Sequence, residues 1–220
     1  QRMNKKNLSV EHTFTLAFQN HQKNNLREAE NLYNEILKIN PNHFKTLFYL
    51  GSLEVQTRRL DIAKQLFQKA IQINPDYADA HNNLGVTLKE LGEHQKARSC
   101  FQKAIQINPD YADAHNNLGV TLKELGEHEQ ALTCYKKAIQ INPNYVDAYI
   151  NLGMILEELK HIYEAKKYYE LALNLDPNKK KACFGYGRIL LELNQHNKAL
   201  AYIEKGAGII KFTQKDFKII

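Results

Sequence analysis

Residues 67–94, FQKAIQINPDYADAHNNLGVTLKELGEH, recur without a single substitution as residues 101–128, so that Phe67 corresponds to Phe101 and His94 to His128. A period of about 20–50 residues is typical of a solenoid, in which one small structural unit cannot bury its apolar face alone and stacks on its neighbours. A ligand of such a protein is expected on a surface shared by several units rather than in one deep pocket.

Four columns of residues, each with the same 34-residue spacing, extend the repeat beyond these two copies. The prolines of the chain are Pro41, Pro75, Pro109, Pro143 and Pro177. Two columns of small residues contain Gly51, Gly85, Gly119, Gly153 and Gly187, and Ala29, Ala63, Ala97, Ala131, Ala165 and Ala199. A mostly aromatic column contains Tyr33, Phe67, Phe101, Tyr135, Tyr169 and Ile203. We therefore divide the chain into a polar lead-in (1–9), a solenoid of six repeats (10–211) and a capping or connecting segment (212–220).

Each repeat is predicted to contain two helices. Apolar residues recur at helical spacing over residues 26–39, and Pro41 ends the unit because proline lacks a backbone N–H and clashes with a continuing helix. Gly85 and Ala97 are small enough to let the two helices of a repeat approach each other closely. Phe101 is then expected to fill the space between them. The predicted fold class is all-α.

The same residues match the consensus of a known family. His81, Leu84, Gly85, Leu88, Ala97, Phe101 and Pro109 fall on the pattern W-x2-L-G-x2-Y, A-x3-F, P, so the chain resembles the tetratricopeptide repeat (TPR) family. The resemblance implies a right-handed superhelical solenoid of antiparallel helix pairs, with the first helix of each pair lining a concave groove. Histidine stands for the usual aromatic residue at His81 and His115, and leucine for the usual tyrosine at Leu88 and Leu122.

Composition argues against membrane and nucleic-acid partners. No apolar run approaches the ~20 residues of a membrane-spanning helix. Residues 179–220 carry nine basic and three acidic side chains, which accounts for the whole net charge of +6. Nucleic acid would instead require basic residues interleaved with aromatic ones along one groove. The three cysteines form no CxxC pair, and we interpret them as small buried side chains of a cytoplasmic protein.

Metal binding and catalysis are not expected. His94, His128 and His196 occupy equivalent positions in different repeats, and packed helices lie about 8–10 Å apart. Zinc requires its ligand nitrogens within ~2.1 Å of one centre. The sequence also contains no Gly-rich phosphate loop, HExxH or GxSxG motif. We predict a protein that is not an enzyme and has no cofactor.

Asparagines at one first-helix position are the main candidate for ligand binding. Asn83, Asn117 and Asn151 resemble the asparagine ladder in the TPR domain of the O-linked N-acetylglucosamine transferase, whose amides grip the ligand's backbone. An Asn amide donates and accepts hydrogen bonds together, so it can match a peptide unit whatever the ligand's side chains are. The alternative is a row of solvated asparagines without a ligand.

The family geometry places further residues in the groove. The complete predicted site contains Asn83, Asn117, Asn151, Asn82, Asn116, Asp79, Asp113, Asp147, Tyr49 and Phe48. For the three aspartates a simpler explanation exists, because an acid in the first turn of a helix is stabilised by the helix dipole. The family's clamp for chaperone carboxylates is not expected, since its leading lysine position holds Phe14, Phe48, Asn82, Asn116, Ile150 and Phe184.

Three functional hypotheses follow. The first is a non-catalytic protein–protein interaction scaffold that binds an extended peptide segment in the concave groove. The second is the substrate-recruiting or regulatory TPR region of a larger enzyme truncated after residue 220. The third is self-association through stacked terminal repeats, which sedimentation at several concentrations would detect.

Overall fold

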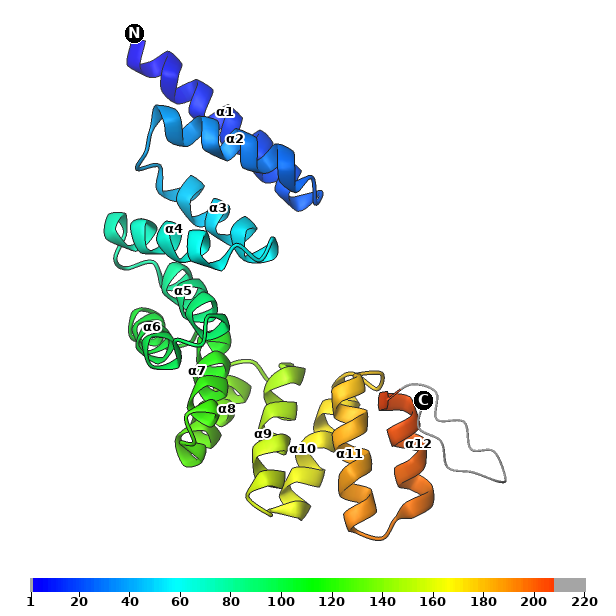
Figure 1. Ribbon diagram of the computed structural model, residues 1–220. Helices are drawn as coiled ribbons and strands as arrows, with labels where there is room; N and C mark the ends of the chain where they lie inside the picture. Colours follow the sequence, from blue (N-terminus) through cyan, green and yellow to red (C-terminus); the bar gives the residue numbers. More distant parts are fainter. Residues whose placement is uncertain (1, 208–220) are drawn as a thin grey trace. The chain divides into compact units, whose positions relative to one another are not determined.

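The computed structural model describes residues 2–207, which form six consecutive helix pairs (Figure 1). The chain divides into two compact units, residues 1–110 and 111–220. Unit 1 contains α1 (Arg2–Gln22), α2 (Leu26–Ile39), α3 (Phe44–Gln56), α4 (Leu60–Ile73), α5 (Ala78–Glu90) and α6 (His94–Ile107). Unit 2 contains α7 (Ala112–Glu124), α8 (His128–Ile141), α9 (Val146–Glu158), α10 (Ile162–Leu175), α11 (Lys180–Glu192) and α12 (His196–Ala207). The described residues include no strand, so the all-α prediction is confirmed for them.

The predicted bounds are correct for α2, whereas the predicted lead-in before the first helix is wrong. Helix α2 spans Leu26–Ile39, as the periodicity indicated. Helix α1 begins at Arg2, so residues 2–9 are helical rather than a separate lead-in. This stretch contains no glycine or proline and two lysines, which are good helix formers, so nothing local stops the helix. The predicted capping segment, 212–220, lies outside the described residues.

An Asn-Pro or Asp-Pro pair closes the first five repeats. The residue before proline must leave the α region, and the five residues at this position have φ between −126° and −137°. Four of their side chains accept a hydrogen bond from the backbone N–H two residues later, at 3.0–3.2 Å, which forms an Asx turn. These four residues are Asn40, Asn108, Asn142 and Asp176.

The turn inside each repeat requires one left-handed residue. The residues with positive φ are Asn24, Arg58, Gly92, Gly126, Lys160 and Asn194, which are 34 apart. Each ends a first helix, where a left-handed residue lets backbone N–H groups bond to the last carbonyls. At Lys160 its own N–H donates to Glu157 O (3.0 Å) and the next N–H donates to Leu156 O (2.8 Å). Lysine is a poor choice here because its Cβ crowds the backbone at φ 63°.

Replacing Lys160 with glycine is expected to stabilise the protein. Removing Cβ relieves roughly 1–2 kcal/mol of left-handed strain, and the greater freedom of glycine in the unfolded chain offsets roughly 0.5–1 kcal/mol of it. The net gain should be about 0.5–1 kcal/mol in urea denaturation. Gly126→Lys is the matched reverse change and should cost a similar amount. A lower midpoint for Lys160→Gly would contradict this account.

Glycine and an aromatic ring pack against each other inside the helix pairs. A Cβ atom added to Gly51, Gly85, Gly119 or Gly153 would lie only 2.6–3.1 Å from a ring on the second helix of the same repeat. The four rings, Phe67, Phe101, Tyr135 and Tyr169, are at most 1% exposed. This confirms that the small column permits close approach and that Phe101 fills the gap. The core of each of these four repeats is therefore a contact between one bare backbone segment and one ring.

Neighbouring pairs pack through the first helix of the later pair, which contacts both helices of the earlier one. In unit 1, α3 contacts α1 and α2, and α5 contacts α3 and α4. In unit 2, α9 contacts α7 and α8, and α11 contacts α9 and α10. Within the described part of either unit, no second helix makes a backbone contact with another second helix. Within each unit the first helices therefore form a row in which each lies against the next.

Ion pairs add to the packing between repeats in unit 1. They join a second helix to the turn of the next repeat: Arg59 lies 2.8 Å from Glu30, and Lys64 lies 2.6 Å from Glu93. The two pairs occupy equivalent positions with the charges exchanged. The two ion pairs thus share their positions in the repeat but have opposite arrangements of charge.

Deleting residues 67–100, one whole period, is expected to leave a folded, shorter protein. The new junction joins Leu66 of α4 to Phe101 of α6 and restores the helical spacing. The stability of a repeat array is roughly a sum of local terms, so the remaining pairs should keep their packing. Circular dichroism should show a helix loss close to the deleted share of the chain. A much larger loss would mean that the middle repeats cannot be removed independently.

Candidate functional site

A pocket lined almost entirely by aromatic residues lies in unit 1. It encloses about 210 Å³ and is lined by Phe14, Phe18, Phe44, Lys45, Phe48, Tyr49 and Tyr77. These residues come from α1, from α3 and from the turn before α5. The pocket thus lies along α3, between α1 and the start of α5. Two of the predicted groove residues, Phe48 and Tyr49, are part of it.

The rings form a continuous, mutually supported wall. Phe48 is 8% exposed, and its ring centroid lies 5.2 Å from those of Tyr49 and Tyr77, with nearly perpendicular planes. Tyr49 also meets Phe18 edge-on at 4.9 Å, and Tyr77 meets Phe44 edge-on at 4.9 Å. Such arrangements are favourable because the positive edge of one ring faces the negative face of the next. The wall therefore holds its shape without a ligand.

Charged groups around the pocket are mostly paired within the protein. Burial and the neighbouring Asp79 carboxylate, to which Tyr77 is hydrogen-bonded, raise the pKa of Tyr77 to about 12. On α1, a Glu11 carboxylate oxygen lies 3.8 Å from Nε2 of His43. Lys45 is exposed and is the one charged residue among those that line the pocket. A ligand in the pocket would therefore meet aromatic rings and one ammonium group.

A polar network connects two of the predicted positions in unit 2. Nδ2 of Asn151 donates a hydrogen bond to Oδ1 of Asn116 at 2.9 Å. The hydroxyl of Tyr145 is hydrogen-bonded to Asp113 and to Asn116, and burial together with the Asp113 charge raises the pKa of Tyr145. Asn116 is only 6% exposed. These side chains therefore join the repeat that contains α7 to the repeat that contains α9.

The acidic position of the first helices has a structural partner at the start of the next first helix. Glu11 pairs with His43, Asp113 with Tyr145, and Asp147 with Lys179, whose Nζ lies 2.9 Å from Oδ1. The partners directly precede α3, α9 and α11. Sequence reasoning placed Asp113 and Asp147 in the groove and missed this contact. The signal was available, because the three partners occupy equivalent positions of their repeats and all can donate.

The predicted asparagines differ in how much surface they present. Asn82 is 6% exposed, like Asn116, so both offer little of their amides to a ligand. Asn83, Asn117 and Asn151 are half-buried on α5, α7 and α9. Nδ2 of Asn82 lies 3.5 Å from Oδ1 of Asn83. Asn83 belongs to unit 1, and Asn117 and Asn151 belong to unit 2, so the ladder is considered for each unit separately.

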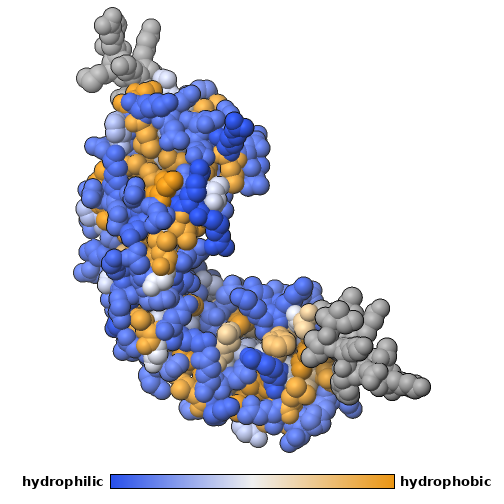
Figure 2. Space-filling model, viewed as in Figure 1, coloured by the Kyte–Doolittle hydropathy of each residue, from blue (hydrophilic) through white to orange (hydrophobic). Residues whose placement is uncertain are grey.

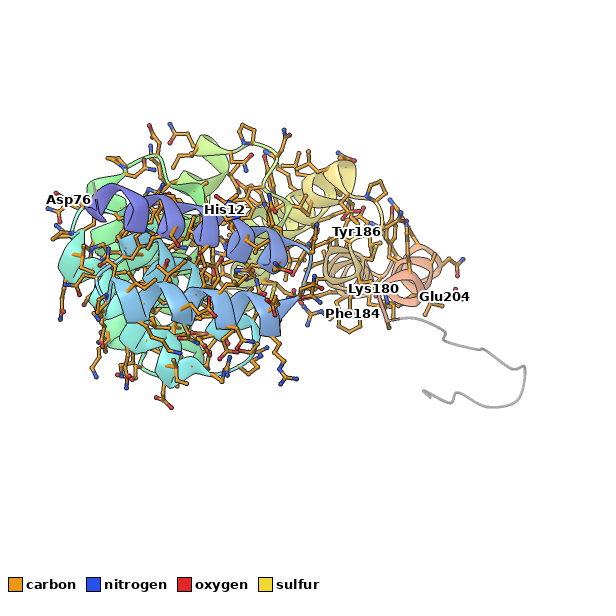
Figure 3. All side chains as sticks on the ribbon, turned by 90° about the horizontal axis from the view of Figure 1, so that it is seen from above. His12, Asp76, Lys180, Phe184, Tyr186 and Glu204 are labelled. Atoms are coloured by element: carbon orange, nitrogen blue, oxygen red, sulfur yellow. The ribbon has the colours of Figure 1, made fainter. Side chains whose placement is uncertain are left out.

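The last described pair presents a second aromatic side chain. Phe184 on α11 is 41% exposed, and the Arg188 guanidinium lies 5.3 Å from its ring centroid. Figure 3 shows Lys180 and Phe184 on α11 beside α12, which carries Glu204. Helix α12 comes so close that a Cβ atom on Gly206 would lie 2.6 Å from the Phe184 backbone nitrogen. Glycine at this position, where the second to fifth repeats have alanine, is thus required by packing.

Two other kinds of site receive no support from the described part of the chain. No group of three His, Cys, Asp or Glu side chains there could hold a metal ion. Likewise, no described helix is long and apolar enough to cross a bilayer. On the face shown in Figure 2, hydrophobic surface is divided into separate patches among hydrophilic residues. The aromatic pocket is thus one apolar feature of the first-helix surfaces in unit 1.

Comparison with known families gives a consistent match. Tetratricopeptide repeat profiles match residues 43–110, 76–144, 110–178 and 180–211. No curated protein sequence matches the chain. The profile matches cover more than half of the chain and follow the helix pairs of the structure.

Several solved structures share the arrangement. MamA has a TM-score of 0.68 and 30% identity, over 73% of this chain and 94% of MamA. PilF of Pseudomonas aeruginosa has a TM-score of 0.80 and 18% identity, over 90% of both chains. YrrB, described as a TPR protein with an unusual peptide-binding site, has a TM-score of 0.63 and 21% identity, over 79% of this chain and 90% of YrrB. The last two similarities concern the fold alone.

Proposed function

Because the chain belongs to the tetratricopeptide repeat family, we propose that it is a non-catalytic scaffold that binds an extended segment of another protein along its first helices. The observation that carries this proposal is the contact of first helix with first helix in both units. It gives each unit one surface shared by several repeats. The aromatic pocket and the half-buried asparagines belong to these surfaces.

The spacing of the helices suits an extended ligand. Packed helices lie about 8–10 Å apart, and three residues of extended chain at ~3.3 Å each span the same distance. One asparagine per repeat could therefore meet every third peptide unit of the ligand. An amide that bonds to backbone groups would tolerate many ligand sequences, and pockets beside it would select side chains.

The proposal can be tested without knowing the natural partner. Peptides of 12 random residues would be selected by display on the full chain, and the tightest one would be mapped by hydrogen exchange. Protection is expected on the first helices α3, α5, α7 and α9. Protection confined to the second helices, such as α4 and α8, would overturn the proposal, because it would place the ligand away from the first-helix surface.

A further inference from the structure

We propose that the aromatic pocket of unit 1 is an anchoring subsite for an aromatic side chain that has a carboxylate next to it in the ligand. The inference rests on the proposed function, because it specifies which kind of segment the first helices of unit 1 would select. It assigns distinct roles to the two chemical groups of the pocket. The rings hold the ligand's side chain, and Lys45 holds its acid.

The size of the pocket favours a single side chain. Small-molecule sites usually enclose about 300–1,000 Å³, whereas this pocket encloses about 210 Å³. Aromatic side chains bury roughly 150–250 Å² each and are the usual anchors of protein interfaces when they enter such pockets. Phe14, Phe18, Phe48 and Tyr49 are fixed by ring contacts at centroid distances of 4.9–6.4 Å. An aromatic ligand side chain would add one more ring to this cluster.

The positive charge at the pocket disfavours a cationic ligand, the other kind of ligand that aromatic walls often bind. Rings also attract cations, such as trimethylated lysine, through their negative faces. Here the Lys45 ammonium is one of the lining groups, so a cation would enter against a like charge. A carboxylate near Lys45 is instead attracted by the ammonium group, which favours binding. The lysine thus changes the preferred ligand from a cation to an acid.

The two nearby acids, Asp79 and Glu11, lie outside the lining of the pocket. Asp79 is hydrogen-bonded to the Tyr77 hydroxyl, and Glu11 lies beside His43. Neither carboxylate is one of the residues that line the pocket, so Lys45 is the charged group that a bound ligand would meet there. Lys45 is exposed at the start of α3, where its flexible side chain can reach a ligand.

Three small probes with the same ring separate these possibilities. N-acetylphenylalanine carries a carboxylate, N-acetylphenylalaninamide is neutral, and phenethyltrimethylammonium is a cation. Each would be titrated into the full chain and followed by backbone amide chemical shifts. The acid is expected to bind in the millimolar range, with saturable shifts at Phe18, Lys45, Tyr49 and Tyr77, and about fivefold more tightly than the neutral probe.

Lys45→Glu is the decisive variant because Lys45 is exposed and the fold does not depend on it. It should abolish the advantage of the acid and make the cation the tightest of the three probes. Lys181→Glu is the matched control, since Lys181 is exposed at the equivalent position of the sixth repeat and changes the net charge equally. Equal affinity for acid and amide, a preference for the cation, no saturable shifts, or the same effect from both variants would overturn the proposal.

A longer probe distinguishes failure of the subsite from failure of the proposed function. A 12-residue peptide with a central Phe-Asp pair should bind far more tightly than N-acetylphenylalanine if extended segments are the ligands. Should it bind no better while the small acid binds as expected, the subsite stands and the extended-segment function fails. Conversely, a displayed peptide that protects the first helices of unit 1 equally well without an aromatic residue beside an acid would overturn the subsite alone.

Discussion

Replacing Phe101 with alanine is expected to destabilise the repeats around α5 and α6 by about 3–5 kcal/mol. The ring is fully buried, and its Cε1 atom lies only 2.6 Å from where a Cβ atom on Gly85 would stand. Because glycine has no side chain to move into the vacated space, the cavity should persist. Urea denaturation followed by circular dichroism would show the loss as early unfolding of one segment, since a repeat array need not unfold in one step.

Two further variants test whether the contact with Gly85 is the cause. Gly85→Ala alone should cost about 1–3 kcal/mol, because its methyl group would overlap the ring. When Gly85→Ala is combined with Phe101→Ala, the new methyl group should enter the cavity. The double variant should therefore lose less stability than the sum of the two single losses. Phe184→Ala removes a 41% exposed ring and should cost less than about 1 kcal/mol. Strict additivity in the double variant would contradict the packing described.

Replacing Asn117 and Asn151 of unit 2 with alanine is expected to weaken binding of a display-selected peptide that maps to unit 2 by roughly 30-fold or more. Each amide could make two hydrogen bonds to the ligand backbone, worth on the order of 0.5–1.5 kcal/mol each. Fluorescence anisotropy with the labelled peptide would measure the change. Folding should respond weakly, except that loss of the Asn151 bond to Asn116 should cost about 1 kcal/mol.

A control with the same chemistry is available on the second helices. Asn34, Asn174 and Asn197 are exposed on α2, α10 and α12, and their replacement with alanine should leave peptide affinity unchanged. Scrambling the peptide's side chains should also do less harm than methylating its amides. If the first-helix variant stays folded and binds normally, the asparagine ladder is wrong. The aromatic residues Phe14, Phe48 and Phe184 then become the better candidates.

Features repeated within one period were predictable from the sequence. The bounds of α2 and the match between Gly85 and Phe101 follow from helical spacing and from the columns, because both depend on residues close together in the chain. The start of α1 was not predictable in this way. A polar stretch without glycine or proline can be helical or irregular. The repeat begins at Val10, so no equivalent residues in other repeats indicate which of the two it is.

The candidate site was predicted less completely because it combines residues from different columns. The pocket joins Phe14 and Phe18 of one repeat with Phe48 of the next and Tyr77 of a turn. Only the packing of α3 between α1 and the start of α5 brings these rings together. The bond between Asn151 and Asn116 is of the same kind, since the two residues stand at different positions of their repeats. A column-by-column interpretation treats each as a separate groove residue.

The way neighbouring pairs pack also makes each unit mechanically anisotropic. Within the described part of each unit, every helix–helix backbone contact between neighbouring pairs includes the first helix of the later pair, and the ion pairs of Arg59 and Lys64 in unit 1 add side-chain links at the turns. A pulling force therefore passes from one pair to the next through the first helix of the later pair, which contacts both helices of the earlier pair, whereas no described second helix of a unit contacts another second helix. Bending a unit about its first helices should need less energy than stretching the unit along their row. Under the proposed function, a unit built this way would adjust its curvature to ligands of different thickness while keeping the spacing of its contact groups constant.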